Sequence, residues 1–237
     1  MQDFFDATIK ANQEIYKLLQ NGLRDELFQP CSKGAGGDVS IKMDLIAEEI
    51  FIKYLQSFGQ ILSEEAGLLK SNSPYQIIID PIDGSDNFLS QLPYFGTSVA
   101  IKKDDKTLGA IIVNLSNGDI FLKENRNFTR AKLDNLVFEK VINNPHAKLG
   151  IFERSYHSNS LVHKLRENKV KYRSPGAFAL SLAYAHDVKF VLYEGKMRIY
   201  DIAAGLYMCD DLYKIEREDF LLVSKDKEIF DKISKFI

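Results

Sequence analysis

Apolar residues recur at helical spacing near the start of the chain, over residues 3–28 and again from Asp44 to Leu55. Side chains three or four positions apart share one face of a helix, so this spacing predicts two amphipathic helices. Residues 32–37, between them, are rich in glycine and too flexible for the interior of a regular element. We therefore expect two helices joined through a mobile glycine-rich loop.

Short runs of β-branched and apolar residues follow, and they are typical of strands. These runs predict strands at 60–63, 75–79, 95–102, 107–114 and 119–123. Asp80-Pro81 is expected to end the second strand, because proline cannot donate a ladder hydrogen bond. Asn117-Gly118 is the signal of a tight hairpin. Helices followed by a meander of strands favour an α+β arrangement.

Residues 125–150 are polar and poorly patterned, which predicts a boundary between two units. Strands and helices then alternate, as in an α/β layer. Strands are expected at 149–153, 170–173, 188–193 and 220–224, and helices at 158–168, 177–185 and 202–212. We expect an N-terminal α+β domain at 1–130, which carries most of the metal ligands, and a C-terminal α/β domain at 131–237.

The overall charge excludes some classes of protein. The 237 residues include 31 Lys and Arg against 33 Asp and Glu, a formal net charge of −2. A dedicated nucleic-acid binder or a polybasic membrane-surface protein would show a basic surplus, so neither partner is expected. The acidic N-terminus does not resemble a signal peptide, and two cysteines, Cys31 and Cys209, form no disulfide framework. A cytoplasmic protein is therefore expected.

The most informative segment is 71–101, which contains Asp80, Asp83 and Asp86 but no Lys or Arg. Two carboxylates on either side of the Ile82 carbonyl can converge, and their repulsion is costly unless a cation relieves it. Oxygen-only ligands suit Mg²⁺ or Mn²⁺ better than zinc. A helix beginning at Gly84-Ser85 would direct N–H groups at an anion, so the segment favours metal-assisted phosphate chemistry.

Each of these features has an ordinary explanation when taken alone. Asp83-Gly84 is common turn chemistry, and Glu64-Glu65 would usually be a solvated surface pair. Asp201 would most often be the N-cap of a helix. It is the combination that favours a functional site.

Residues 80–88, Asp-Pro-Ile-Asp-Gly-Ser-Asp-Asn-Phe, resemble the signature of the inositol monophosphatase family, within the broader group that includes the fructose-1,6-bisphosphatases. Ser63-Glu64-Glu65 and residues 200–205 resemble two further motifs of the family and fall in the same order. The resemblance covers about residues 33–205. It implies a layered αβαβα sandwich of the sugar phosphatase type and Mg²⁺-dependent hydrolysis of a phosphate monoester, with Mn²⁺ as an alternative ion.

The resemblance also implies roles for individual residues. Ser85, partnered by Asp44, would activate a water, and Glu65 would orient it. The implied metal ligands are Glu64, Asp80, the Ile82 carbonyl, Asp83 and Asp201. The implied substrate-binding residues are Lys33, Gly84, Ser85, Gly176 and Glu194.

Some positions depart from the family pattern. Tyr200 stands where tryptophan is usual, and Phe178 replaces a smaller residue near the substrate. Lys196 and Arg198 either contact a second phosphate or are solvated charges.

These features predict a phosphatase for a small sugar or inositol phosphate, inhibited by lithium and forming a homodimer, as relatives often do. Fructose 1,6-bisphosphate and 3′(2′),5′-bisphosphate nucleotides are alternative substrates. A regulatory, protein-binding role is the alternative from a different class.

Overall fold

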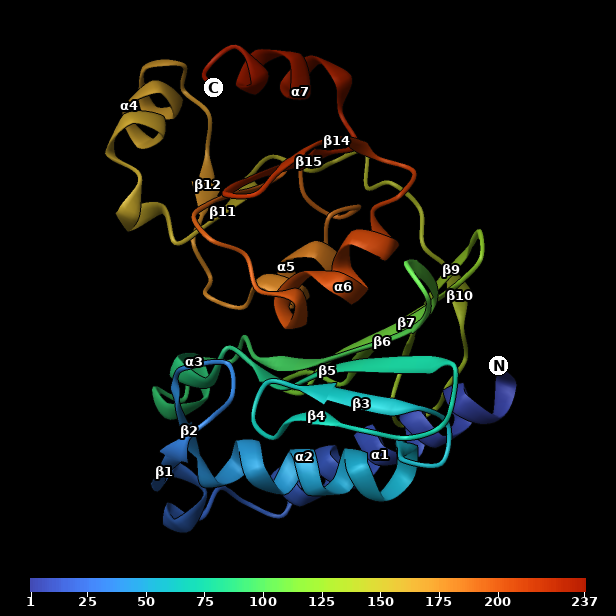
Figure 1. Ribbon diagram of the computed structural model, residues 1–237. Coiled ribbons are helices and arrows are strands. Elements are labelled where there is room, and N and C mark those ends of the chain that lie inside the picture. The colour runs from blue at the N-terminus through green and yellow to red at the C-terminus, as the bar shows by residue number, and fades with distance from the viewer.

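The computed structural model describes residues 1–237, except for the side chain of Ser32. Layers of helices and sheets alternate along the molecule (Figure 1). The outer helices α1 (Gln2–Gln20) and α2 (Lys42–Leu55) cover one face of a large sheet, and α5 (Phe178–Ala183) and α6 (Ile199–Met208) lie between that sheet and a smaller one. Helices α4 (Asn159–Glu167) and α7 (Lys227–Ser234) cover the far side of the small sheet. The predicted αβαβα sandwich is confirmed.

The large sheet has eight strands in the order β10-β9-β8-β7-β6-β5-β3-β4. Its strands are β3 (Gln60–Ser63), β4 (Gly67–Leu69), β5 (Tyr75–Asp83), β6 (Gly96–Lys103), β7 (Lys106–Asn114), β8 (Asp119–Glu124), β9 (Asn127–Lys132) and β10 (Glu139–Lys140). Strands β3 and β5 are parallel, and every other pair is antiparallel. The parallel pair matters for the site, because the carboxyl ends of β3 and β5 meet at one edge.

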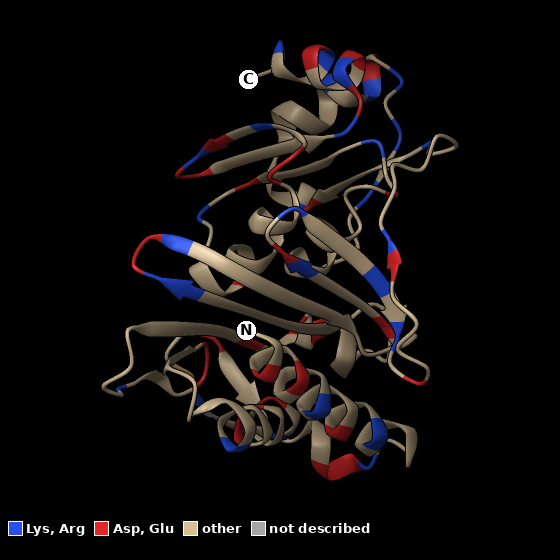
Figure 2. Cartoon of the chain, turned by 90° about the vertical axis from the view of Figure 1, so that its right-hand side faces the viewer, with Lys and Arg blue, Asp and Glu red and all other residues tan. Residues whose placement is uncertain are grey.

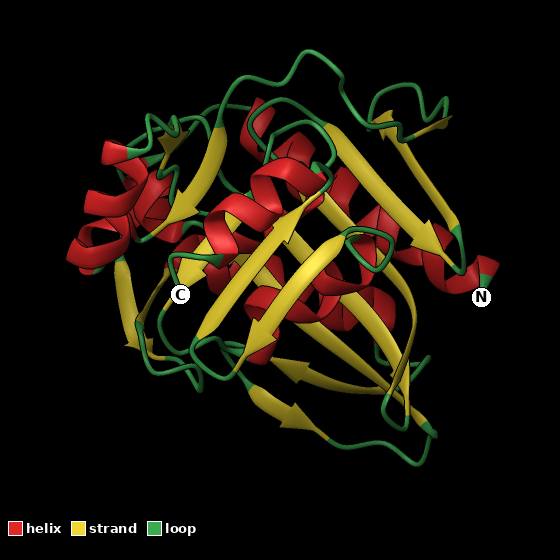
Figure 3. Ribbon diagram, turned by 90° about the horizontal axis from the view of Figure 1, so that it is seen from above, coloured by secondary structure: helices red, strands yellow, loops and turns green.

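The small sheet has five strands in the order β12-β11-β13-β15-β14. Its strands are β11 (Gly150–Glu153), β12 (Tyr172–Arg173), β13 (Val191–Glu194), β14 (Tyr213–Arg217) and β15 (Phe220–Ser224). Figure 3 looks down on the stack from the side of this sheet. Shorter elements complete the fold: η1 (Asp25–Phe28), the pair β1 (Pro30–Lys33) and β2 (Val39–Ile41), α3 (Ser85–Leu89) and η2 (Ser155–His157).

Small residues allow the middle helices to pack between two sheets. Ala203 and Ala204 of α6 belong to the core that faces the large sheet, while Leu206 packs toward the small one. A Cβ on Gly205 would lie 2.5 Å from the Cβ of Leu182 in α5, so only glycine permits this approach of the two helices. Helix α6 therefore packs closely against α5 between the two sheets.

The structure corrects the prediction for Pro81. Strand β5 continues through Pro81 to Asp83, and its pairing with β6 shifts register between Asp80 and Asp83. A bulge of this kind suspends the ladder locally, so that proline is tolerated within the strand. The irregularity gives the two aspartates different surroundings although they are three residues apart.

Several elements in the polar parts of the sequence were missed. Strands β9 and β10 lie within residues 125–150, and β14 and α7 lie in the charged segment that follows residue 212. A division after residue 130 would cut β9, whose residues pair with β8. We therefore propose that the two units divide within 141–149, between the last strand of the large sheet and the first of the small one.

Charged residues of both signs are interspersed on α1, on α7 and at several strand ends (Figure 2). Among the residues that the structure describes, no helix combines the length and the apolar character needed to cross a membrane.

Candidate active site

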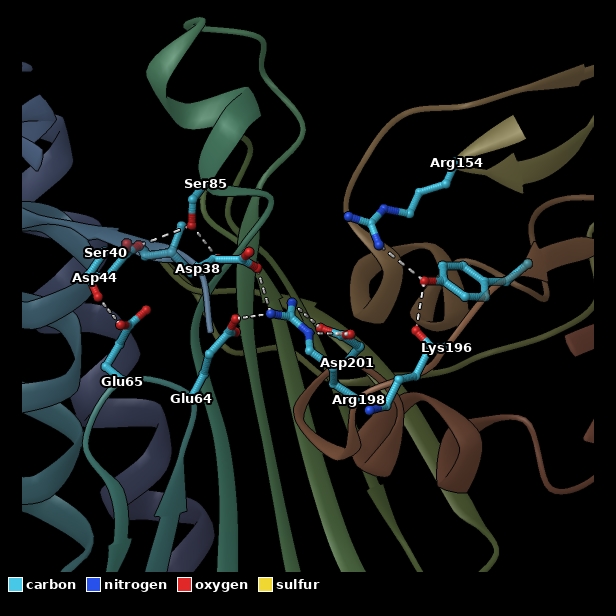
Figure 4. A network of polar contacts seen from close by, with 12 residues as sticks. Asp38, Ser40, Asp44, Glu64, Glu65, Ser85, Arg154, Lys196, Arg198 and Asp201 are labelled. Carbon is cyan, nitrogen blue, oxygen red and sulfur yellow. Dashed lines mark hydrogen bonds and ion pairs between the residues drawn. The ribbon is translucent and has the colours of Figure 1, made fainter. Parts of the chain in front are cut away.

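Acidic side chains from several elements line one cavity of about 810 Å³. Glu64 directly follows β3, Asp80 and Asp83 belong to β5, and Asp44 lies in the first turn of α2. Asp201 comes from the first turn of α6, in the C-terminal half of the chain, and lies beside Arg198 (Figure 4). The cavity therefore joins the edge of the large sheet to the C-terminal half of the chain.

Glu64, Asp80 and Asp201 form the tightest group. Each offers one carboxylate oxygen, and these oxygens lie within 4.8 Å of one another. Asp80 Oδ1 is buried and has no hydrogen-bond partner among the described residues. Buried polar atoms nearly always have a partner, so this orphaned oxygen marks a place for a ligand. An all-oxygen donor set of this kind fits a hard divalent cation such as Mg²⁺.

The electrostatics of the group point the same way. Burial, with charge from Asp201 and Glu65 only partly offset by Arg198, raises the pKa of Glu64 to about 7. Burial and the charge of Glu64 raise the pKa of Asp80 well above its usual range. A bound cation would stabilise the charged form of these carboxyls and lower both pKa values.

Asp83 has a different partner. Its Oδ2 accepts a hydrogen bond of 2.7 Å from the backbone N–H of Leu180 in α5. Burial raises its pKa, against the opposing effect of that hydrogen bond. The structure thus brings Asp83 into the cavity but outside the group of three, where it links the large sheet to the middle helices.

Ser85 and Asp44 form a hydrogen-bonded pair beside the acids (Figure 4). The Ser85 hydroxyl lies 3.1 Å from Asp44 Oδ1 and 3.0 Å from the Ile82 carbonyl oxygen, so it can donate to either. The other oxygen of Asp44 accepts the Ile41 N–H at 2.7 Å, while burial raises the pKa of Asp44 to about 7. A carboxyl with this pKa can exchange a proton near neutral pH.

Gly84 makes the turn that presents this serine. Its φ of +91° is left-handed, and a Cβ there would lie 3.0 Å from the Cβ of Ala177. Gly176, which also lines the cavity, has the same φ and donates its N–H to the buried Glu153 at 2.8 Å. Both glycines therefore occupy backbone conformations that other residues rarely adopt.

The glycine-rich loop packs directly onto two of the acids. The N–H groups of Ala35 and Gly36 donate to the backbone carbonyls of Glu65 and Glu64, at 2.9 and 2.6 Å. A Cβ on Gly36 would lie 2.6 Å from the Glu64 side chain, so the close approach requires glycine. The Glu65 carboxylate accepts a hydrogen bond from Ser40.

Arg198 is the internal counter-ion of the group. It precedes α6, and its guanidinium donates two hydrogen bonds of 3.0 Å to Asp201, one of 2.8 Å to Asp38 and one to Glu64 (Figure 4). Burial alone would lower the pKa of Arg198, but Asp201 and Glu64 hold it above its ordinary value. The sequence left two roles open for Arg198, contact with a second phosphate or a solvated charge. Neither matches this arrangement, because its guanidinium is bonded to carboxylates of the protein.

The remaining predicted residues lie at the margins. Lys33 ends β1 and Glu194 ends β13; both are exposed, and neither is among the residues that line the cavity. Phe178 lines it and stacks on Tyr193, with ring centroids 4.3 Å apart and an interplanar angle of 12°. Sequence reasoning missed Arg154, which lines the cavity, because a lone arginine after a strand carries no motif or spacing signal.

Comparisons with known proteins agree with this geometry. The model of the inositol monophosphatase family matches residues 1–211. The chain is 32% identical over 151 residues to the fructose-1,6-bisphosphatase of Pyrococcus furiosus, covering 62% of this chain and 56% of that one. It is 28% identical over 196 residues to the fructose-1,6-bisphosphatase/inositol-1-monophosphatase of Methanocaldococcus jannaschii, covering 80% of this chain and 75% of that one. Its fold is similar to that of the Leishmania major fructose-1,6-bisphosphatase, with a TM-score of 0.81 and 17% sequence identity. The match covers 99% of this chain and 93% of that one.

Proposed function

Because the chain belongs to the inositol monophosphatase family, we propose that it is a metal-dependent phosphatase acting on a small sugar or inositol phosphate. The observation that carries the proposal is the group of Glu64, Asp80 and Asp201, with an orphaned oxygen on Asp80. A hydroxyl–carboxylate pair beside this group supplies the means to move a proton. The relatives whose names include fructose-1,6-bisphosphatase keep a bisphosphate substrate open.

The three carboxylates would hold the ion, which we propose to be Mg²⁺ or, alternatively, Mn²⁺. Asp83 and the Ile82 carbonyl are proposed as further ligands, although their present partners are Leu180 and Ser85. When bound, the ion lowers the pKa of a nearby water and offsets charge on the leaving oxygen.

The chain's own groups would carry the proton. The Ser85 hydroxyl can take a proton from the attacking water while it passes its own to Asp44. Asp44, with a pKa of about 7, suits this exchange. Four histidines occur in the chain and none is among the residues that line the cavity, so this pair, rather than a histidine, is the proposed base. Hydrolysis would proceed by direct attack of water, without a covalent enzyme intermediate.

Other groups would position the substrate. The N–H groups of Gly84 and Ser85 are proposed to bind the phosphate, and Gly176 to contact the rest of the substrate. Glu65 is proposed to orient a water, although its carboxylate now accepts from Ser40. Lys33 and Glu194 remain predictions, and both would have to move to reach the cleft.

A phosphate-release screen tests the proposal. Inositol, hexose and nucleotide phosphates are incubated with the protein in Mg²⁺, in Mn²⁺ and in a chelator. Release that requires metal is expected from the wild type, and none is expected from Asp80→Asn, which keeps the shape of the side chain and removes its charge. Circular dichroism verifies that the variant is folded. Metal-independent release, or full activity in the folded variant, would contradict the site assignment.

Further properties are proposed from the same family resemblance. Lithium should inhibit the enzyme, and the protein is expected to be a cytoplasmic homodimer. Sedimentation with and without Mg²⁺ tests the dimer. A regulatory, protein-binding role remains an alternative, and a pull-down with the inactive Asp80→Asn variant separates binding from turnover.

A further inference from the structure

Arg154 and Arg198 are the only cationic side chains among the described residues that line the cleft. Arg198 is fully engaged by carboxylates. Arg154, by contrast, forms no ion pair with any residue in the described part of the chain, and its Nη1 lies 3.4 Å from the Tyr193 hydroxyl. One cation of the cleft is thus neutralised within the protein, and the other is available to a ligand.

The backbone presents Arg154 in a constrained way. The residue directly follows β11 and has a left-handed φ of +53°. Such a conformation in a non-glycine residue costs about 1 kcal/mol or more and tends to be retained at functional sites. The preceding Glu153 is buried and accepts hydrogen bonds from Ser181 and from the Gly176 N–H, at 2.5 and 2.8 Å. The position of Arg154 is therefore set by a buried neighbour.

The side chain of Arg154 is also supported. The Tyr193 hydroxyl, which the guanidinium contacts, donates to the Lys196 carbonyl at 3.1 Å, and the Tyr193 ring stacks on Phe178. Figure 4 shows Arg154 extending into the cleft from the side opposite Glu64 and Glu65. This support preorganises the guanidinium and so lowers the entropic cost of binding a ligand.

The surroundings suit the distal part of a substrate. Tyr156, which is 72% exposed, lines the same end of the cleft with its aromatic side chain, and Ser174 adds a hydroxyl. The acids at the opposite end form a cation site, so the cleft is divided into two ends of opposite character. A planar guanidinium without a carboxylate partner is well suited to bidentate binding of a phosphate.

We infer that Arg154 binds a second phosphate of the substrate, at the end of the cleft opposite the carboxylates where the first phosphate is hydrolysed. This inference rests on the proposed function and narrows it to bisphosphorylated small molecules. It also transfers to Arg154 the role that the sequence left open for Lys196 and Arg198. Lys196 is not among the lining residues, and Arg198 is occupied.

The test compares substrates that differ by one phosphate. Fructose 1,6-bisphosphate is compared with fructose 1-phosphate, and inositol 1,4-bisphosphate with inositol 1-phosphate, all in saturating Mg²⁺. In Arg154→Gln, kcat/KM for the preferred bisphosphate should fall by about 10- to 100-fold, mainly through KM, since a charged hydrogen-bond pair is lost. The value for the matching monophosphate should stay within about twofold. Arg154→Lys should restore part of the loss, because the charge returns without the planar fork.

Arg166→Gln provides the control, since Arg166 is an exposed arginine on α4 and is not among the residues that line the cleft. It should leave both substrates unaffected. Equal losses for both substrates in Arg154→Gln, or no loss, would overturn the inference while leaving the phosphatase assignment intact. A wild type that releases phosphate from none of these substrates or those of the wider screen would overturn the proposed function and this inference with it.

Discussion

The two ends of the cleft use the same residue type in opposite ways. Arg198 lies among Asp38, Glu64 and Asp201, and ion pairs with these carboxylates neutralise its charge. Arg154 lies against a tyrosine hydroxyl and has no such carboxylate in the described structure. The function of a cleft arginine is therefore determined by its partners, since a neutralised guanidinium holds protein segments together and an available one can bind an anion.

The same contrast bears on metal binding. Through its three carboxylate partners, Arg198 joins Asp38, just after the glycine-rich loop, to the end of β3 and the first turn of α6. A divalent ion that enters the group of acids has to compete with this guanidinium for Glu64 and Asp201. Metal binding is thus expected to involve a rearrangement at the acidic end, whereas the Arg154 end should change little.

The largest expected effect concerns the hydroxyl at the acidic end. Ser85→Ala removes the group that is proposed to transfer a proton to Asp44, and general-base assistance of this kind contributes ~10²–10⁴-fold. We expect kcat to fall within that range in phosphate-release assays. Mg²⁺ affinity, measured calorimetrically, should remain within about threefold. A large loss of metal affinity would show that Ser85 serves the ion rather than the proton.

The second prediction concerns the pH dependence of stability without metal. The pKa values of Asp44 and Glu64 are about 7 in the folded protein, mainly because both are buried, against about 4 in an unfolded chain. Between these values the folded state binds more protons than the unfolded one, so stability should fall as pH rises from about 4 to 7.

Thermal melts in chelator should show this loss, which we expect to amount to a few kcal/mol. Mg²⁺ should reduce the loss by stabilising the charged carboxylates, and Asp44→Asn should make the slope shallower. The opposite result would be a melting temperature in chelator that rises from about pH 4 to 7, with the same slope in Asp44→Asn. It would contradict the raised pKa values assigned to Asp44 and Glu64.

The third prediction separates the two arginines directly. Arg198→Met removes the internal competitor, so Mg²⁺ should bind about 5- to 50-fold more tightly, within the usual range of coupling between two binding events. The metal-free variant should also melt at a lower temperature, because the acids lose their counter-ion. Calorimetry and melts with and without Mg²⁺ measure both effects. Arg154→Gln should change neither quantity, and equal responses of the two variants would remove the distinction between the ends.

The smallest expected effect concerns the support of Arg154. Tyr193→Phe keeps the ring that stacks on Phe178 and removes the hydroxyl that contacts the guanidinium. Because this hydroxyl only positions the guanidinium, through a hydrogen bond of 3.4 Å, kcat/KM for the bisphosphate should fall by only about two- to fivefold. In the Arg154→Gln background the same change should have no further effect, and an additive loss would contradict the proposed support.

Much of the acidic end could be predicted from the sequence. Asp80, Asp83 and Ser85 belong to one continuous segment, residues 80–88. Residues so close in sequence are also close in space, so a sequence motif can predict that they share a site. The hydrophobic patterns located most helices and central strands, because burial on one face leaves a periodic signal. Strands β9, β10 and β14 and helix α7 were not predicted in this way, because polar residues dominate their segments.

Contacts between distant segments were decided only by the tertiary structure. Arg198 reaches Glu64 across 134 residues and Asp38 across 160, and Asp83 reaches Leu180 across 97. No spacing rule extends over such separations, so the sequence left the role of Arg198 open and did not single out Arg154. The sequence by itself determined which acids are present and that they occur in motifs of the inositol monophosphatase family. Packing of the layers decided which cleft arginine pairs with these acids and which one has no carboxylate partner in the described structure, because that choice depends on how the two halves of the chain meet.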